Sequence, residues 1–179
     1  MAWDNEHKEK TRQRIVASAA KLFTQFGFDN IGINEIMADA GLTRGAFYAH
    51  FNTKSDLYAE SIVAGAIMAA AQHIKEASVQ DIVSGYLTKE HVAGTGQHCP
   101  LAFLTTDISQ RDAQVRQAYT TVFNGLIKRL QKDCLHRSQA IKQAVLMIGG
   151  VAISRALDDN DLVEELLFAC QQTEALDIL

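Results

Sequence analysis

The sequence predicts an all-α protein. Its 179 residues contain one proline, Pro100, so long helices are permitted, because proline inside a helix costs about 3 kcal/mol. Apolar residues recur at the 3.6-residue period of amphipathic helices, and no useful stretch alternates as a strand would. Hydrophobic residues make up 47% and charged residues 21%, which is typical of a folded chain. The length suits one domain, or a small module joined to a larger one.

The charge distribution argues against one mode of nucleic-acid binding. The formal net charge is −4, whereas a protein that coats nucleic acid uses many cations to neutralise phosphates. Residues 1–54 hold seven Lys and Arg against six Asp and Glu, and residues 55–179 hold ten against fifteen. The acidity therefore belongs to the C-terminal part, and a local basic site in the N-terminal part remains compatible with the composition.

Membrane insertion and export are not expected. The longest apolar stretches, residues 62–71 and 144–153, have ten residues each, about half of the roughly 20 that span a bilayer. The N-terminus is charged where a secretory signal would be apolar. Three scattered cysteines without a pairing pattern are typical of a reducing compartment, so we expect a cytoplasmic protein.

The first helix is expected from about residue 6 to Phe26, because Ile15, Ala19 and Leu22 continue one apolar stripe to that residue. Gly27 supplies a left-handed stop.

A second helix, from Ile33 to Ala40, repeats the apolar spacing and ends at Gly41. Thr43 is a suitable N-cap for a third helix over residues 44–51, because its hydroxyl can accept a bond from a free backbone N–H.

Thr53 and Asp56 have the spacing of a variant capping box, which opens a fourth helix running to about residue 77. The glycine-containing loop at residues 93–100 is the clearest break in the rest of the chain. Glu164 is expected to complete a capping box for the last helix. The remaining helices are expected over residues 78–92, 101–109, 112–134, 138–157 and from about 161 onward.

Residues 31–50 carry the most specific motif, two short helices joined by Gly41-Leu42-Thr43, which is the arrangement of a helix-turn-helix. Phe47 and Phe51 are four residues apart and can pack into the core from one side of the second helix. Helical hairpins with a glycine turn are common, so a helical interaction module that binds no DNA is the alternative.

Arg44 and Tyr48 share another side of that helix, and Gly45 would let the backbone approach a DNA groove closely. Arg44 could pair with guanine or reach a phosphate. Lys54 lies at the start of the next helix, whose free N–H groups and dipole attract phosphate. The candidate DNA-binding residues are Thr43, Arg44, Gly45, Ala46, Tyr48, His50 and Lys54.

Several motifs stand in order along residues 8–68. They are Ala19, Leu22 and Phe23 in A-x-x-L-F, the Phe26–Phe28 triplet, A-G-L-T-R-G, F-Y-x-H-F, and Lys54 with Leu57 in K-x-x-L. Through these motifs the segment resembles the N-terminal DNA-binding domain of the TetR family of bacterial transcriptional regulators. One departure is Gly32, where the family usually has a Ser or Thr cap, whose absence weakens the helix start by about 1 kcal/mol or less.

The resemblance extends less specifically to residues 69–179, through H-C-P-L, I-S-Q-R-D-x-x-V-R and A-I-S-R-A-L-D-D. It implies a helical effector-binding and dimerisation domain, a homodimer that binds a palindromic operator, and a repressor that a small apolar or aromatic effector releases. No cofactor, metal or enzymatic activity is expected. Residues of this kind more often belong to plain core, and the candidate pocket residues are Met68, Tyr86, Phe103, Tyr119, Phe123 and Met147.

Cys99 precedes a short helix that Pro100 would open, so a low-pKa redox or electrophile sensor is one hypothesis and a small buried thiol is the other. A Cys/His hydrolase would need a histidine and an orienting Asn or Asp in the same cleft. Neither Cys134 with His136, nor His91 with His98 and Cys99, has the paired spacing of a zinc site.

Overall fold

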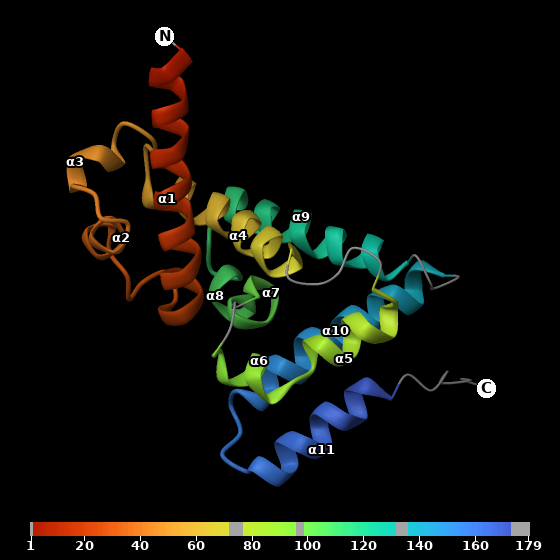
Figure 1. The fold of residues 1–179 in the computed structure, drawn as a ribbon. Helices are drawn as coiled ribbons and strands as arrows, with labels where there is room; N and C mark the ends of the chain where they lie inside the picture. The colour runs from red at the N-terminus through yellow and green to blue at the C-terminus, as the bar shows by residue number, and fades with distance from the viewer. Residues whose placement is uncertain (1, 72–76, 96–98, 132–135, 173–179) are drawn as a thin grey trace. The chain divides into compact units, whose positions relative to one another are not determined.

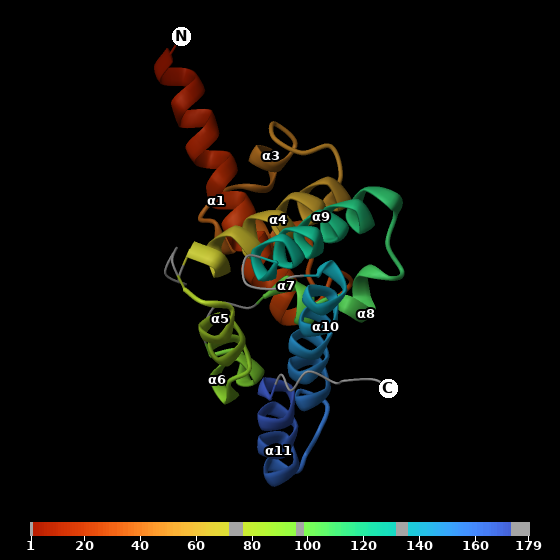
Figure 2. The same ribbon diagram turned by 90° about the vertical axis from the view of Figure 1, so that its right-hand side faces the viewer.

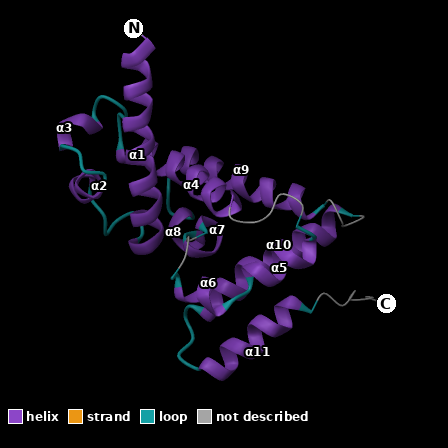
Figure 3. Cartoon of the chain, viewed as in Figure 1, coloured by secondary structure: helices purple, strands orange, loops and turns teal. Residues whose placement is uncertain are grey.

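The computed structural model describes residues 2–71, 77–95, 99–131 and 136–172, and every regular element in these ranges is an α-helix (Figure 3). The all-α prediction is therefore confirmed. None of the helices in these ranges combines the length and apolar character needed to cross a membrane.

The chain forms two compact units, Met1–Ala70 with Gln97–Val122, and Ala71–Gly96 with Phe123–Leu179. Unit 1 contains α1 (Ala2–Phe26), α2 (Ile33–Asp39), α3 (Arg44–Phe47), α4 (Lys54–Ala71), α7 (Pro100–Phe103), α8 (Thr105–Ile108) and the first part of α9 (Ala113–Leu130) (Figure 1). Unit 2 contains the rest of α9 with α5 (Val79–Tyr86), α6 (Lys89–Ala93), α10 (Arg137–Ser154) and α11 (Asn160–Gln171).

One apolar core holds unit 1 together. Phe23 of α1 and Tyr58 of α4 are fully buried with their ring centroids 4.7 Å apart. Leu104, Ile108 and Val115 belong to the same core, so the segment from α7 to α9 packs with the N-terminal helices. The compact units thus do not follow the expected domain boundary between residues 68 and 69. The assignment of DNA binding to residues 8–68 and of effector binding and dimerisation to residues 69–179 stays a prediction.

The glycine stops are confirmed. Gly27 and Gly41 have φ angles of 81° and 65°, the left-handed region that residues with a Cβ rarely adopt. The third helix is shorter than expected, because α3 ends at Phe47 instead of residue 51. His50 N donates to Phe47 O at 2.9 Å, an i to i−3 bond, so the chain continues in tight turns.

Three other helix predictions needed correction. The expected helix 78–92 is two helices, since Leu87 leaves helical geometry and Thr88 caps α6 by accepting from His91 N at 3.2 Å. The expected helix 101–109 is divided into α7 and α8 at Leu104. The cap of α11 is Asp159, whose carboxylate accepts from the first turn, while Glu164 pairs with Lys89.

Unit 2 is built on α10 and α11, which pack side by side (Figure 2). Gly150 makes this contact close, because a Cβ there would lie 3.2 Å from Cys170 Sγ and 2.9 Å from Leu87 Cδ2. The neighbouring Gly149 has no such contact within 4 Å. The helix expected to end at about residue 77 would cross residues 72–76, and the one expected to end at about residue 134 would enter residues 132–135. Both ranges lie outside the described residues, so these two ends stay predictions.

Candidate DNA-binding site

The residues from Thr43 to His50, called the recognition segment below, present a polar and aromatic surface. Thr43, Arg44 and Gly45 are exposed, and Tyr48 is 58% exposed. Phe47 is fully buried and stacks on Phe51 with centroids 5.8 Å apart. The predicted division of this segment into a core side and an outward side is therefore present.

The turn before the recognition segment is fixed by backbone bonds. Leu42 N donates to Met37 O at 2.8 Å and Gly41 N donates to Ala38 O at 3.0 Å. These bonds satisfy carbonyls at the end of α2, as in other glycine-terminated helices.

The helix starts around the segment are capped unequally. Thr43 is the N-cap of α3 but makes no side-chain capping bond. Thr53 and Asp56 form the predicted reciprocal box, with both N–H···O distances at 3.0 Å. Gly32 has no side chain to cap α2. The Glu35 carboxylate accepts a hydrogen bond from the Gly32 N–H at 3.1 Å, so this helix start keeps one capping bond that was not predicted from the sequence.

Lys54 points inward, toward the core of unit 1. Its Nζ donates to Phe28 O at 2.5 Å and lies 4.2 Å from the centroid of the Phe28 ring. Burial lowers the pKa of Lys54. One N–H of the ammonium thus holds the loop after α1, and the assignment of Lys54 as a phosphate ligand stays a prediction.

His50 is half-buried at the end of the recognition segment. Burial lowers its pKa, and the cations Lys8 and Arg12 act in the same direction. The Glu9 carboxylate acts in the opposite direction.

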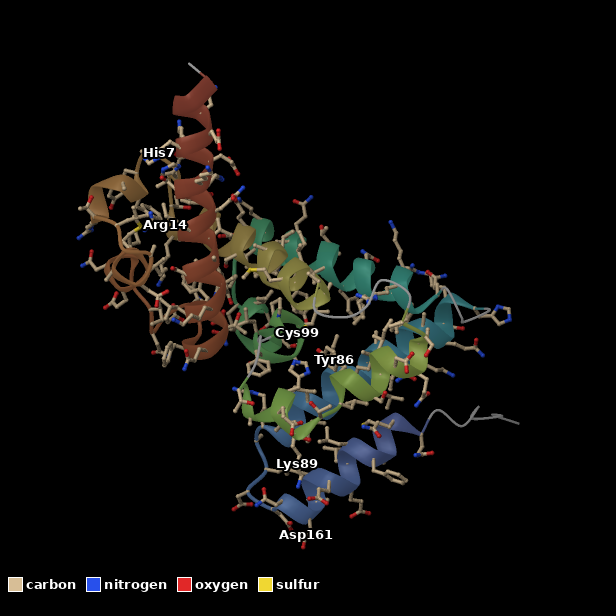
Figure 4. The ribbon with its side chains drawn as sticks, viewed as in Figure 1. His7, Arg14, Tyr86, Lys89, Cys99 and Asp161 are labelled. Atoms are coloured by element: carbon tan, nitrogen blue, oxygen red, sulfur yellow. The ribbon has the colours of Figure 1, made fainter. Side chains whose placement is uncertain are left out.

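Two arginines of α1 contact the helix-turn-helix, and they were not among the site residues predicted from the sequence. Arg14 Nη2 donates to Ala40 O at 2.7 Å, and Arg12 Nη1 donates to His50 O at 2.6 Å. Arg14 is labelled on α1 in Figure 4. Their sequence signal was only a basic stretch in the first helix, which does not show whether a cation meets solvent or a carbonyl.

The six candidate pocket residues fall into both units. In unit 1, Phe103 packs against the core and Tyr119 donates from its hydroxyl to Leu101 O at 2.8 Å. In unit 2, Tyr86 contacts His91 edge-on and Met147 is fully buried. Met68 is 39% exposed on α4 and Phe123 is half-buried on α9. Their assignment to a ligand pocket stays a prediction.

Cys99 is the N-cap residue of α7 and is 8% exposed (Figure 4). This burial matches the expected small buried thiol more closely than an accessible sensor. The metal hypotheses used Cys134 and His98, which lie outside the described residues.

The buried aromatic support, the glycine turn and the exposed recognition segment define a helix-turn-helix protein. Residues 15–61 match the family described as "Bacterial regulatory proteins, tetR family". Residues 15–61 therefore carry the domain that this family of transcriptional regulators shares.

Curated relatives agree with the family. Over 55 residues, 31% of this chain and 26% of the relative, the chain is 46% identical to the HTH-type transcriptional regulator AcrR of Shigella flexneri. Over 166 residues it is 25% identical to the probable acrEF/envCD operon repressor of Escherichia coli strain K12, covering 91% of this chain and 63% of that repressor. The chain thus matches between about a quarter and 63% of the length of these relatives.

Solved structures show the same fold across both units. The reduced form of E. coli NemR has a TM-score of 0.71 at 19% identity, covering 90% of this chain and 95% of that one. A TetR-family regulator from Cytophaga hutchinsonii has a TM-score of 0.73 at 17% identity, covering 92% and 93%. At these identities the likeness concerns the fold.

Proposed function

We propose that this chain is a DNA-binding transcriptional repressor that a small molecule releases from its operator. The observation that carries the proposal is the recognition segment, where Tyr48 and Arg44 are exposed on a helix anchored by the buried Phe47. The match of residues 15–61 to the TetR family and the regulators among the relatives support the same function.

Base readout is assigned to one side of the recognition segment. Arg44 can pair bidentately with guanine, and Gly45 allows close approach to the groove. Ala46 and Tyr48 complete the groove-facing side, while Thr43 and His50 are proposed to contact phosphates. Lys54 is proposed to act by holding the loop after α1, since its ammonium already binds Phe28 O.

We propose a homodimer formed through α10 and α11. Apolar side chains on these helices are exposed in the single chain, among them Val145 at 55%, Ile153 at 53% and Phe168 at 63%. Exposed apolar surface on consecutive helices is typical of an association surface. Two-fold symmetry would place two recognition segments about 34 Å apart, in successive major grooves.

Release by an effector is proposed as a population shift. An effector that favours a conformation in which α4 is tilted would move the recognition segments out of groove register. DNA and effector must then weaken each other's binding by the same factor. The effector is proposed to be apolar or aromatic, which suits the aromatic residues Phe103 and Tyr119 of unit 1, and the repressor is proposed to act in the cytoplasm without enzymatic activity.

The test is binding of a DNA duplex from the protein's own promoter region by the purified chain and its Tyr48→Ala variant. Tyr48 is 58% exposed and packs edge-on against Phe47, at 5.2 Å between centroids, so the variant should fold normally and lose at least tenfold in affinity. Gln80→Ala, an exposed change on α5, should bind as the wild type does. Equal retention of all three proteins in a gel shift contradicts the site assignment.

A further inference from the structure

We infer that Arg12 and Arg14 are positioning residues that hold the helix-turn-helix in its DNA-binding geometry, and that Arg12 is not a phosphate ligand. This inference rests on the proposed DNA-binding function. The two arginines lie two residues apart on α1, and each donates to a carbonyl at the end of one helix of the motif. Arg14 binds Ala40 O, the C-cap of α2, and Arg12 binds His50 O, which follows α3.

The recognition segment needs support of this kind. The helix α3 has four residues, far fewer than an isolated helix needs in water. Thr43 makes no side-chain capping bond, so the start of α3 is weakly fixed. The last carbonyls of a helix lack partners inside it, and charged donors bind such carbonyls more strongly than neutral donors do.

Arg12 also binds α4. Its Nε donates to Glu60 Oε1 at 3.1 Å, its Nη2 donates to the other oxygen of the same carboxylate, and its guanidinium carbon lies 4.2 Å from the centroid of Phe51. All three guanidinium nitrogens are therefore engaged by protein groups. Lys10, by contrast, is 68% exposed and pairs with Glu6 one helical turn away.

This arrangement makes Arg12 a link between α4 and the recognition segment. The Glu60 carboxylate fixes the guanidinium, and the guanidinium fixes the His50 carbonyl. A displacement of α4 along or around its axis therefore moves the anchor of the recognition segment. The same contact that sets the geometry for DNA would carry a change in α4 to the DNA-binding surface.

The test compares Arg12→Gln, Glu60→Gln and the control Lys10→Gln. Each protein is titrated with the duplex that the wild type enriches in a selection from random DNA and with a random-sequence duplex, at several salt concentrations. Positioning predicts that Arg12→Gln and Glu60→Gln each weaken specific binding about tenfold. Non-specific binding and the salt slope should stay at the control's values, since the number of phosphate contacts is unchanged.

Glu60→Gln gives the sharpest discrimination. If Arg12 were a phosphate ligand restrained by Glu60, releasing it would tighten DNA binding; if Arg12 is a positioning residue, the release weakens specific binding. Tighter binding by Glu60→Gln overturns the inference. So does an equal loss on both duplexes in Arg12→Gln, with a salt slope reduced by about 0.9.

A DNA-free measurement separates this inference from the proposed function. Amide hydrogen exchange at His50 and Phe51 should accelerate in Arg12→Gln, while exchange within α2 stays unchanged. Arg14→Gln should accelerate exchange at Gly41 and Leu42. If the wild type enriches no duplex, the proposed function fails, and unchanged exchange in both variants overturns the positioning role independently.

Discussion

Arg111 donates two hydrogen bonds to the carboxylate of Asp29, from Nη1 at 3.2 Å and from Nη2 at 2.6 Å. The Nη2 atom also donates to Asp107 at 2.7 Å, and the guanidinium carbon lies 4.6 Å from the Phe28 centroid. Tyr58 donates to the same Asp107 at 2.5 Å. The loop after α1 and the end of α8 are thus fastened together within unit 1.

Replacing Arg111 with Met should lower the free energy of unfolding by about 2 kcal/mol, because Asp107 loses its cationic partner in a largely buried position. The side chains of Arg111 and Asp107 are 14% and 19% exposed. Arg116→Met, on the exposed side of α9, should change the free energy of unfolding by less than about 0.5 kcal/mol. Urea unfolding of both variants checks this, and equal effects would show that charge alone, not the buried contact, is responsible.

The same contact predicts a dependence on pH. Hydrogen bonding by Arg111 lowers the pKa of Asp29 below its ordinary value of 3.8. Between the pKa of Asp29 in the folded chain and its higher pKa in the unfolded chain, the unfolded chain binds more protons. The stabilisation by Asp29 is therefore fully present above the unfolded-state pKa and is lost as the pH falls through the folded-state pKa. The stability difference between wild type and Arg111→Met should narrow below about pH 4. A difference that stays constant to about pH 3 would contradict the Asp29 contribution.

The two adjacent glycines of α10 should respond oppositely to alanine. Gly149→Ala adds a Cβ with no heavy atom within 4 Å and should stabilise the helix by up to about 1 kcal/mol. Gly150→Ala forces Leu87 and Cys170 aside and should destabilise the protein by about 1 to 2 kcal/mol. Thermal unfolding compares the stability of the two variants. A gain in stability in both variants would mean that Leu87 moves away from the added Cβ without cost.

The two threonine caps separate stability from DNA binding. Thr53→Ala removes a formed capping bond to Asp56 N and should cost about 1 kcal/mol. Thr43→Ala removes no capping bond and should cost less than about 0.5 kcal/mol of stability, while weakening DNA binding through loss of its proposed phosphate contact. Chemical unfolding and a DNA titration check the pair, and a larger stability loss in Thr43→Ala would contradict the capping geometry.

The proposed dimer surface predicts a change in oligomeric state. Val145→Glu places a charge on the exposed apolar side of α10, where burying it against a second copy would be costly. The wild type should sediment as a dimer and Val145→Glu as a monomer. Lys142→Glu, one turn earlier and already exposed as a charged residue, should remain dimeric. A wild-type monomer at high concentration would contradict the proposed dimer.

Local signals predicted much of the fold. Apolar periodicity found the main helices, and Gly27 and Gly41 marked their ends, because left-handed backbone is decided by one residue. The length of α3 was overestimated, since Ala49 and His50 donate to carbonyls three residues earlier, which no side-chain pattern encodes. The packing of Leu104, Ile108 and Val115 with the N-terminal helices joins residues far apart in sequence, so periodicity could not reveal it.

The candidate site was predicted only in part, again because sequence periodicity does not reveal tertiary contacts. Exposure of Tyr48 and burial of Phe47 follow from helical spacing, and both were anticipated. The inward direction of Lys54 and the carbonyl contacts of Arg12 and Arg14 depend on tertiary neighbours. A cation in a basic segment has the same sequence signature whether it meets phosphate, an aromatic ring or a helix end.

Selection of bound sequences from random duplex DNA tests the central claim most directly. The wild type should enrich a two-fold symmetric sequence whose half-sites lie about one helical turn apart, and Tyr48→Ala should enrich none under the same conditions. Failure of the wild type to enrich any sequence, or equal enrichment by both proteins, would contradict DNA recognition through the segment from Thr43 to His50.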